Sequence, residues 1–164
     1  MIINDAMVVI HLAKITLLEA SCGYFQPALI PEAVHQEILA GQKKGYEDVA
    51  IIEELLKAGT LGVRRVKDKK LLKRAEAFNV QRGEAEAVAL YWQERANYLA
   101  SDDDNLRKKG TLLNIRLIGT PAVILTLYRK KLISQNKLIG SLQALRNIGW
   151  FSNAVIDTIV MEAT

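Results

Sequence analysis

The sequence predicts an α/β protein: a three-layer α/β/α sandwich with a central parallel sheet of about five strands. Short apolar runs alternate along the chain with longer segments in which apolar residues recur at helical spacing. Strands separated by helices pair in parallel through right-handed crossovers. With 164 residues, three prolines, ten glycines and no internal repeat, nothing marks a linker. We therefore expect a single domain over residues 1–164.

The first half of the chain predicts three strands and three helices. A brief strand at residues 1–3 precedes Asp5, which occupies the position of an N-cap. Pro31 suits the first turn of a helix, and Gly59 closes a later one. The expected order is helix 6–21 with a stop at Gly23, strand 24–31, helix 32–41, helix 47–59 and strand 62–66.

The second half begins with two helices, the second rich in Ala, Glu and Leu, which favour helix. We expect the C-terminal helices, from about residue 136, to pack on the rest of the domain. The expected order is helix 69–78, helix 82–96, strand 97–101, a loop and short helix over 102–110, strand 115–119, and helices 120–132, 136–149 and 153–163.

Charge and apolar content restrict the partners and the compartment. The formal charge of +4 and the basic clusters at residues 64–74, 107–109 and 128–131 favour an anionic partner. The apolar run at 122–128 is far shorter than the roughly 20 residues that cross a bilayer. With no secretion signal visible and a lone Cys22, we expect a cytoplasmic protein without membrane contact.

Carboxylates follow two of the predicted strands at their ends. Asp5 follows the first strand, and the run "LASDDDN" places Asp102, Asp103 and Asp104 directly after strand 97–101. Clustered carboxylates repel one another unless water or a cation stabilises them. Because ligands bind at the carboxyl ends of parallel strands, the two groups converge if these strands are neighbours.

Two further acids lie within apolar helix faces. Glu37 shares a face with Val34 and Ile38, and Glu84 begins a helix whose next turn carries apolar residues on the same side. Such a carboxylate is costly unless it is paired or bound to metal. Four carboxylates around one point suit one or two Mg²⁺ or Mn²⁺ ions, which prefer oxygen ligands.

Structural roles explain each acid equally well when it is taken alone. Asp5 suits an N-cap, Glu37 and Glu84 suit positions that interact with a helix dipole, and the aspartate run suits a solvated turn. His11 and His35 make no zinc-like spacing with Cys22, so all three are interpreted as packing or surface groups.

Five segments together resemble a PIN-domain protein. They are "IINDAMVVIHLAKI", "LIPEAVHQEIL", "RGEAEAVAL", "LASDDDNLRKKG" and "LIGTPAVILTLYRKKLI". They follow one another in order over residues 2–150, and they are most similar to the bacterial and archaeal branch whose third acidic motif reads GEAEA. The resemblance implies a metal-dependent ribonuclease with a central parallel sheet, usually of five strands.

The resemblance assigns the candidate site residue by residue. Asp5, Glu37, Glu84 and Asp103 match the four acids of the family, which implies that they are catalytic and hold Mg²⁺ or Mn²⁺. Asp102 is an auxiliary metal ligand, and Glu86 is the rival of Glu84 for the third acid. The family commonly has Thr and Ser after its first aspartate, and this chain has Ala6 and Met7 there.

The resulting expectation is a Mg²⁺- or Mn²⁺-dependent endoribonuclease whose Arg107, Lys108 and Lys109 contact RNA phosphates. Because many PIN domains are toxins, the resemblance also implies a toxin–antitoxin role with an antitoxin protein as partner, and a homodimer. A catalytically weak or inactive PIN-like module that binds RNA or a protein is the alternative. A phosphotransfer or nucleotide-sugar enzyme is disfavoured, because no glycine-rich phosphate loop is present.

Overall fold

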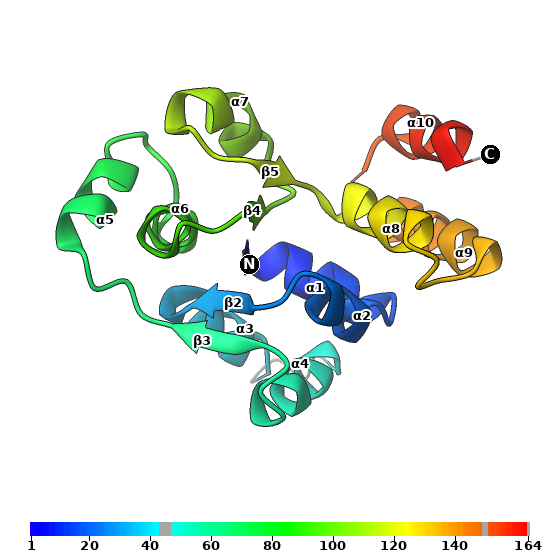
Figure 1. Ribbon diagram of the computed structural model, residues 1–164, viewed down its shortest axis with the longest axis horizontal. Helices are drawn as coiled ribbons and strands as arrows, with labels where there is room; N and C mark the ends of the chain where they lie inside the picture. Colours follow the sequence, from blue (N-terminus) through cyan, green and yellow to red (C-terminus); the bar gives the residue numbers. More distant parts are fainter. Residues whose placement is uncertain (43–46, 149–150, 164) are drawn as a thin grey trace.

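The computed structural model describes residues 1–42, 47–148 and 151–163, and its centre is one parallel sheet (Figure 1). The strands are β1 (Ile2–Asn4), β2 (Ala28–Pro31), β3 (Gly62–Arg64), β4 (Tyr98–Ala100) and β5 (Leu117–Ile118). They pair in the order β3-β2-β1-β4-β5, and every pairing is parallel. The predicted α/β fold with a five-stranded parallel sheet is confirmed.

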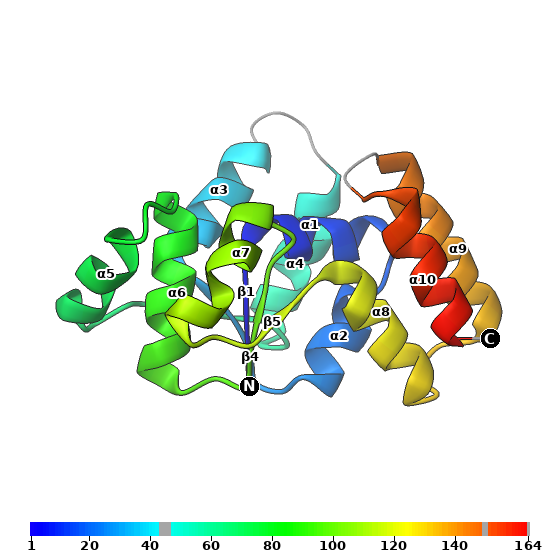
Figure 2. The same cartoon turned by 90° about the horizontal axis from the view of Figure 1, so that it is seen from above.

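Helices connect the strands and cover both faces of the sheet, as the predicted three layers require (Figure 2). Those formed by the described residues are α1 (Ala6–Lys14), α2 (Leu18–Tyr24), α3 (Glu32–Gln42), α4 (Asp48–Lys57), α5 (Lys69–Glu76), α6 (Arg82–Glu94), α7 (Asp104–Leu113), α8 (Thr120–Arg129), α9 (Gln135–Ile148) and α10 (Asn153–Ala163).

The strands divide their side chains between two apolar cores. Ile2 and Ala100 contribute to a core with α1, α2, α3, α4 and α8 to α10, whereas Ile3 and Leu99 contribute to a core with α5, α6 and α7. This division follows from the strand geometry, because successive side chains point to opposite faces. Burial on both faces explains why β1 and β2, which are buried throughout, read as apolar runs.

The prediction of one helix over residues 6–21 is wrong in one respect: the helix is interrupted between Lys14 and Leu18. Thr16 has φ 60°, a left-handed conformation that interrupts the helix, and the second helix, α2, continues past Gly23 to Tyr24. Apolar residues on both sides of the break remain buried. The break therefore leaves no mark in the apolar spacing from which the helix was predicted.

Strand and helix ends also differ from the prediction. The expected strand 24–31 is restricted to β2, because Tyr24 ends α2, and Pro31 ends β2 instead of lying in the first turn of α3. β3 and β5 are shorter than predicted. The expected end of a helix at Gly149 lies outside the described residues.

The last three helices lie together at one end of the molecule, where α10 packs on α8 and α9 (Figure 1). In the described residues, the C-terminal helices α9 and α10 therefore pack against α8. Among the helices that the structure describes, none combines the length and apolarity needed to cross a membrane.

Candidate functional site

A cavity of about 450 Å³ lies where β1 and β4 end, at the edge of a parallel sheet where ligands bind. Residues of α1, α3, α6 and α7 complete its wall. None of the described residues that line it is a lysine or an arginine, so the wall carries an excess of negative charge. The carboxylates in it are Asp5, Glu37, Glu84, Asp102, Asp103 and Asp104.

Asp5 is the most buried of these acids, with 7% of its surface exposed. It is the N-cap of α1, where its Oδ1 accepts a hydrogen bond from the backbone N–H of Val8 at 2.9 Å. Burial raises the pKa of Asp5 to about 7; Asp102 and Glu84 add to the rise, and hydrogen bonds from Ser101 and Val8 oppose it. The cap hydrogen bond engages one of the two carboxylate oxygens of Asp5.

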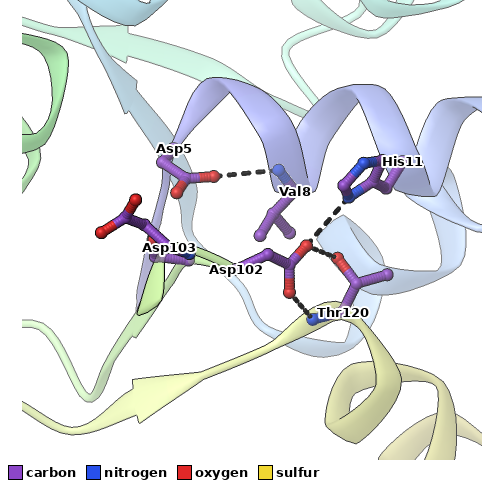
Figure 3. Close-up of polar contacts among 7 residues, drawn as sticks. Asp5, Val8, His11, Asp102, Asp103 and Thr120 are labelled. Atoms are coloured by element: carbon purple, nitrogen blue, oxygen red, sulfur yellow. Dashed lines mark hydrogen bonds and ion pairs between the residues drawn. The ribbon is translucent and has the colours of Figure 1, made fainter. Parts of the chain in front are cut away.

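Asp103 repeats this arrangement on the neighbouring strand. It is the N-cap of α7, and its Oδ1 accepts a hydrogen bond from the N–H of Leu106 at 2.7 Å. Its own N–H donates to Ser101 Oγ at 3.2 Å. Because Asn4 of β1 pairs with Ala100 of β4, the two caps emerge beside each other at the cavity (Figure 3).

Glu84 lies in the first turn of α6, with its side chain folded back over the start of the helix. Its Oε2 accepts a hydrogen bond from the N–H of Gln81 at 3.0 Å, one half of a capping box. Burial raises the pKa of Glu84, the hydrogen bond from Gln81 opposes this rise, and Asp103 and Glu37 add to it. The carboxylates of α3, α6 and α7 are therefore close enough to repel one another.

Glu86, the rival for the third acid, has a different position. Its Oε2 accepts a hydrogen bond from the N–H of Ala33 at 2.9 Å, so it caps the start of α3. Its Oε1 lies 3.9 Å from Arg82 Nε. Glu84 lines the cavity and Glu86 does not.

Glu37 reaches the cavity from the middle of α3 across the backbone of Gly83. A Cβ atom added at Gly83 would lie 2.5 Å from Glu37 Oε1, closer than such atoms approach each other. Burial raises the pKa of Glu37, and the charge of Glu86 contributes. The glycine therefore leaves the space that the Glu37 carboxylate occupies.

Asp102 turns away from Asp5 and Asp103, toward α1 and α8 (Figure 3). Its Oδ1 accepts the N–H of Thr120 at 2.7 Å, and its Oδ2 accepts the Thr120 hydroxyl. His11 Nδ1 lies 2.9 Å from the same Oδ2. The expected role of Asp102 as a metal ligand would compete with these bonds, which join β4 to α1 and α8.

His11 is buried, as its interpretation as a packing group expects, but it also has a polar contact in the cavity wall. His11 is 1% exposed, yet its ring lines the cavity and bonds to a carboxylate. His35 Nε2 lies 3.2 Å from Glu53 Oε1, and Cys22 is buried; neither lines the cavity. Helical spacing predicts that His11 lies on the buried face of α1. It does not predict the contact with Asp102, because Asp102 follows β4 and lies 91 residues later in the chain.

The three basic residues of α7 differ in their surroundings. Arg107 and Lys108 are exposed. Lys109 Nζ donates to the carbonyl oxygens of Phe78 at 2.6 Å and Asn79 at 3.3 Å, so it fastens the loop between α5 and α6 to α7. Arg107 and Lys108 remain candidates for phosphate contact, whereas Lys109 has bonds within the protein.

Positive ends of several helices point at the same edge of the sheet. Asp5 and Asp103 cap α1 and α7, and Glu84 lies in the first turn of α6. Acids at these positions gain from the helix dipole and from free N–H groups. The raised pKa values of Asp5 and Glu84 show that these gains do not offset burial and mutual repulsion.

Oxygen donors of this kind fit a divalent cation chemically. Hard ions such as Mg²⁺ and Mn²⁺ prefer carboxylate oxygen, and positive charge would relieve the repulsion described above. Across residues 1–42, 47–148 and 151–163, no three His, Cys, Asp or Glu side chains stand close enough together to hold an ion as they are. Coordination by several of these acids therefore requires side-chain movement.

Comparison with protein families identifies the class. A family model described as PIN domain matches residues 1–164, so the chain belongs to the PIN-domain family. PIN domains are generally nucleases and generally use divalent metal ions. No curated protein and no solved structure matches the chain significantly.

Three residues that shape the site were not predicted from the sequence: Ser101, Gly83 and Thr120. Ser101 bonds to both strand-end aspartates, Gly83 makes room for Glu37, and Thr120 anchors Asp102. Each lies within a segment that carried the family resemblance. Their roles depend on contacts between distant segments, which spacing along one segment does not show.

The raised pKa of Asp5 predicts how stability depends on pH in the metal-free protein. Between 3.8 and about 7 the unfolded chain loses the Asp5 proton while the folded protein keeps it. The free energy of unfolding therefore falls as pH rises through this range. Urea unfolding at several pH values measures it. In Asp5→Asn the fall should be smaller, and an unchanged profile in this variant contradicts the burial of Asp5.

Gly83→Ala is expected to weaken metal binding without loss of stability. Alanine favours helix over glycine by up to about 1 kcal/mol, but its methyl group would displace the Glu37 carboxylate. We expect Mn²⁺ affinity, measured by titration calorimetry, to fall roughly tenfold. Gly140→Ala is the matched control, since nothing lies within 4 Å of a Cβ there. Equal Mn²⁺ affinity in both variants would show that Glu37 takes no part.

Thr120→Val is expected to lower the free energy of unfolding by about 1–3 kcal/mol, because it leaves a buried acceptor of Asp102 without its hydroxyl donor. Chemical denaturation measures the change. Thr126→Val on the same helix is the control: its hydroxyl is exposed and donates to the carbonyl of Ala122. A loss at Thr120 no larger than at Thr126 argues against an anchoring role of Asp102.

Proposed function

We propose that the protein is a metal-dependent ribonuclease that hydrolyses phosphodiester bonds within RNA. The supporting observation is that carboxylates from four separate segments line one cavity at the carboxyl edge of the sheet in a PIN domain. Such a concentration of like charge is unfavourable in a wall without lysine or arginine among its described residues. A bound divalent cation would offset the repulsion between these carboxylates.

Asp5, Glu37, Glu84 and Asp103 are the residues that would hold the metal. A metal held there supplies a water of lowered pKa and positive charge for the phosphate oxygens in the transition state. Asp102 is less suited to this role, since Thr120 and His11 already engage its oxygens.

The residues of the chain contribute orientation and proton handling. Hydrogen bonds from Val8 and Leu106 fix Asp5 and Asp103 through one oxygen each. Burial raises the pKa of Asp5 to about 7 in the metal-free protein, so binding of a metal to this carboxylate near neutral pH would release its proton. Arg107 and Lys108 are exposed on α7, where the phosphates of a bound strand would meet them.

A binding module without cleavage is the second candidate. Ala6 and Met7 both line the cavity, and neither offers a hydroxyl to a water or a metal ligand there. An RNA- or protein-binding PIN-like module would need the cavity and its charge but no hydrolysis. A toxin role, an antitoxin partner and a homodimer stay predictions.

The rate of RNA cleavage in Mn²⁺, measured for Glu84→Gln and Glu86→Gln, tests whether Glu84 acts in the proposed site while Glu86 only caps α3. Glutamine retains an acceptor for the cap hydrogen bond in each case and removes only the charge. We expect at least a hundredfold loss of cleavage rate for Glu84→Gln, the size of a lost metal or acid–base contribution, and little change for Glu86→Gln.

Asp5→Asn should lower the cleavage rate at least as much as Glu84→Gln does. Cleavage that persists unchanged in Asp5→Asn and Glu84→Gln would contradict the proposed site. Absence of cleavage by the unmodified protein with Mg²⁺ and Mn²⁺, together with tight RNA binding, would instead identify the binding module.

A further inference from the structure

A second charged surface lies on α5, apart from the cavity. Residues 64–74 contain seven lysines and arginines and one acid, Asp68. The Asp68 side chain is the N-cap of α5, where it accepts hydrogen bonds from the N–H groups of Lys70 and Leu71. Its carboxylate is therefore engaged at the helix start.

The lysines at the start of α5 stand where they oppose the stability of their own helix. Lys69 and Lys70 lie in the first turn, at the positive end of the helix dipole. Lys69 and Lys73, like Lys70 and Arg74, are four residues apart, a spacing at which like charges cost about 0.2–0.5 kcal/mol per pair. By contrast, Lys130 and Lys131 follow the end of α8, where cations favour the helix.

Nothing in the described part of the chain neutralises these lysines. Ala75 is buried and Leu71 and Leu72 pack into the core beside α6, so the lysines project to solvent on the opposite side. The ion pairs of the described residues include Arg64 and Arg65 but not Lys67, Lys69, Lys70 or Lys73.

The C-terminal end of α5 is joined to the cavity through a short, fixed connection. Its N-terminal lysines lie beside the far end of α6, where Gln93 Oε1 accepts hydrogen bonds from the N–H groups of Lys67 and Asp68. After α5 the chain passes Phe78 and Asn79, whose carbonyls Lys109 holds against α7, and reaches Gln81 and Glu84 in the cavity wall. Both views show α5, α6 and α7 side by side at the end of the molecule opposite α8 to α10 (Figures 1 and 2). A strand that leaves the cavity and follows α6 along its length would meet the lysines of α5.

We propose that the lysine surface of α5, formed by Lys67, Lys69, Lys70 and Lys73, binds the phosphate backbone of the RNA outside the cleavage site. The assignment of RNA rests on the proposed ribonuclease function. Closely spaced lysines without paired acids suit a polyanion, whereas lysine is depleted in protein–protein interfaces. None of the large apolar side chains that the described residues expose lies on α5, so a protein partner lacks an anchor there.

Binding of a fluorescein-labelled single-stranded RNA to the full chain tests this surface, with Asp5→Asn as background to prevent cleavage. In the variant Lys69→Gln, Lys70→Gln, Lys73→Gln we expect about a 10- to 100-fold loss of affinity near 0.1 M salt. The slope of log affinity against log salt should become less negative by about 2, as for three lost phosphate contacts. The thermal midpoint should stay the same or rise, because the substitutions remove repulsion.

The matched control is Lys57→Gln, Lys130→Gln, Lys131→Gln, which removes the same charge from exposed lysines away from α5. Equal RNA affinity and salt slope in the two triple variants would overturn the proposal and leave the ribonuclease function intact. Binding of polyglutamate by the unmodified surface as tight as that of RNA would also overturn it, and would indicate an acidic protein partner. Loss of cleavage by Asp5→Asn tests the catalytic proposal separately.

Discussion

Repulsion between carboxylates at the carboxyl edge of the sheet is the constraint on which the site depends. Asp5 is almost completely buried, and its neighbours Asp102 and Glu84 add to the cost of its charge. The fold offsets part of this cost by placing Asp5 and Asp103 at helix N-termini, where backbone N–H groups donate hydrogen bonds to the carboxylates. The part that remains is what a bound divalent cation would offset in the proposed site.

Strand order brings these acids together, and helix caps hold them. Because β1 and β4 are adjacent and parallel, residues that follow them emerge at the same edge. α6 brings Glu84 to the cavity at its first turn, while Glu86, two residues later, caps α3 and fixes the helix that carries Glu37. One helix thus supplies an acid to the cavity and positions another.

The sequence predicted the fold because both of its signals are local. Apolar runs mark strands buried on both faces, and helical spacing marks the segments between them. Asp5 and Asp103 were identifiable as strand-end acids for the same reason. The break at Thr16 was not predictable, since apolar residues continue on both sides of it. The orientation of Asp102 toward His11 and Thr120 depends on three segments far apart in the chain. Spacing alone also left Glu84 and Glu86 as alternatives; in the structure Glu84 lines the cavity and Glu86 does not.

Crystals of the protein grown with Mn²⁺, followed by an anomalous difference map at the manganese edge, test the central claim most directly. The account predicts a peak inside the cavity, with carboxylate oxygens of Asp5 and Asp103 as ligands and Glu37 and Glu84 turned toward it. Manganese bound only outside the cavity, or an empty cavity in which these four side chains keep separate partners, would contradict it.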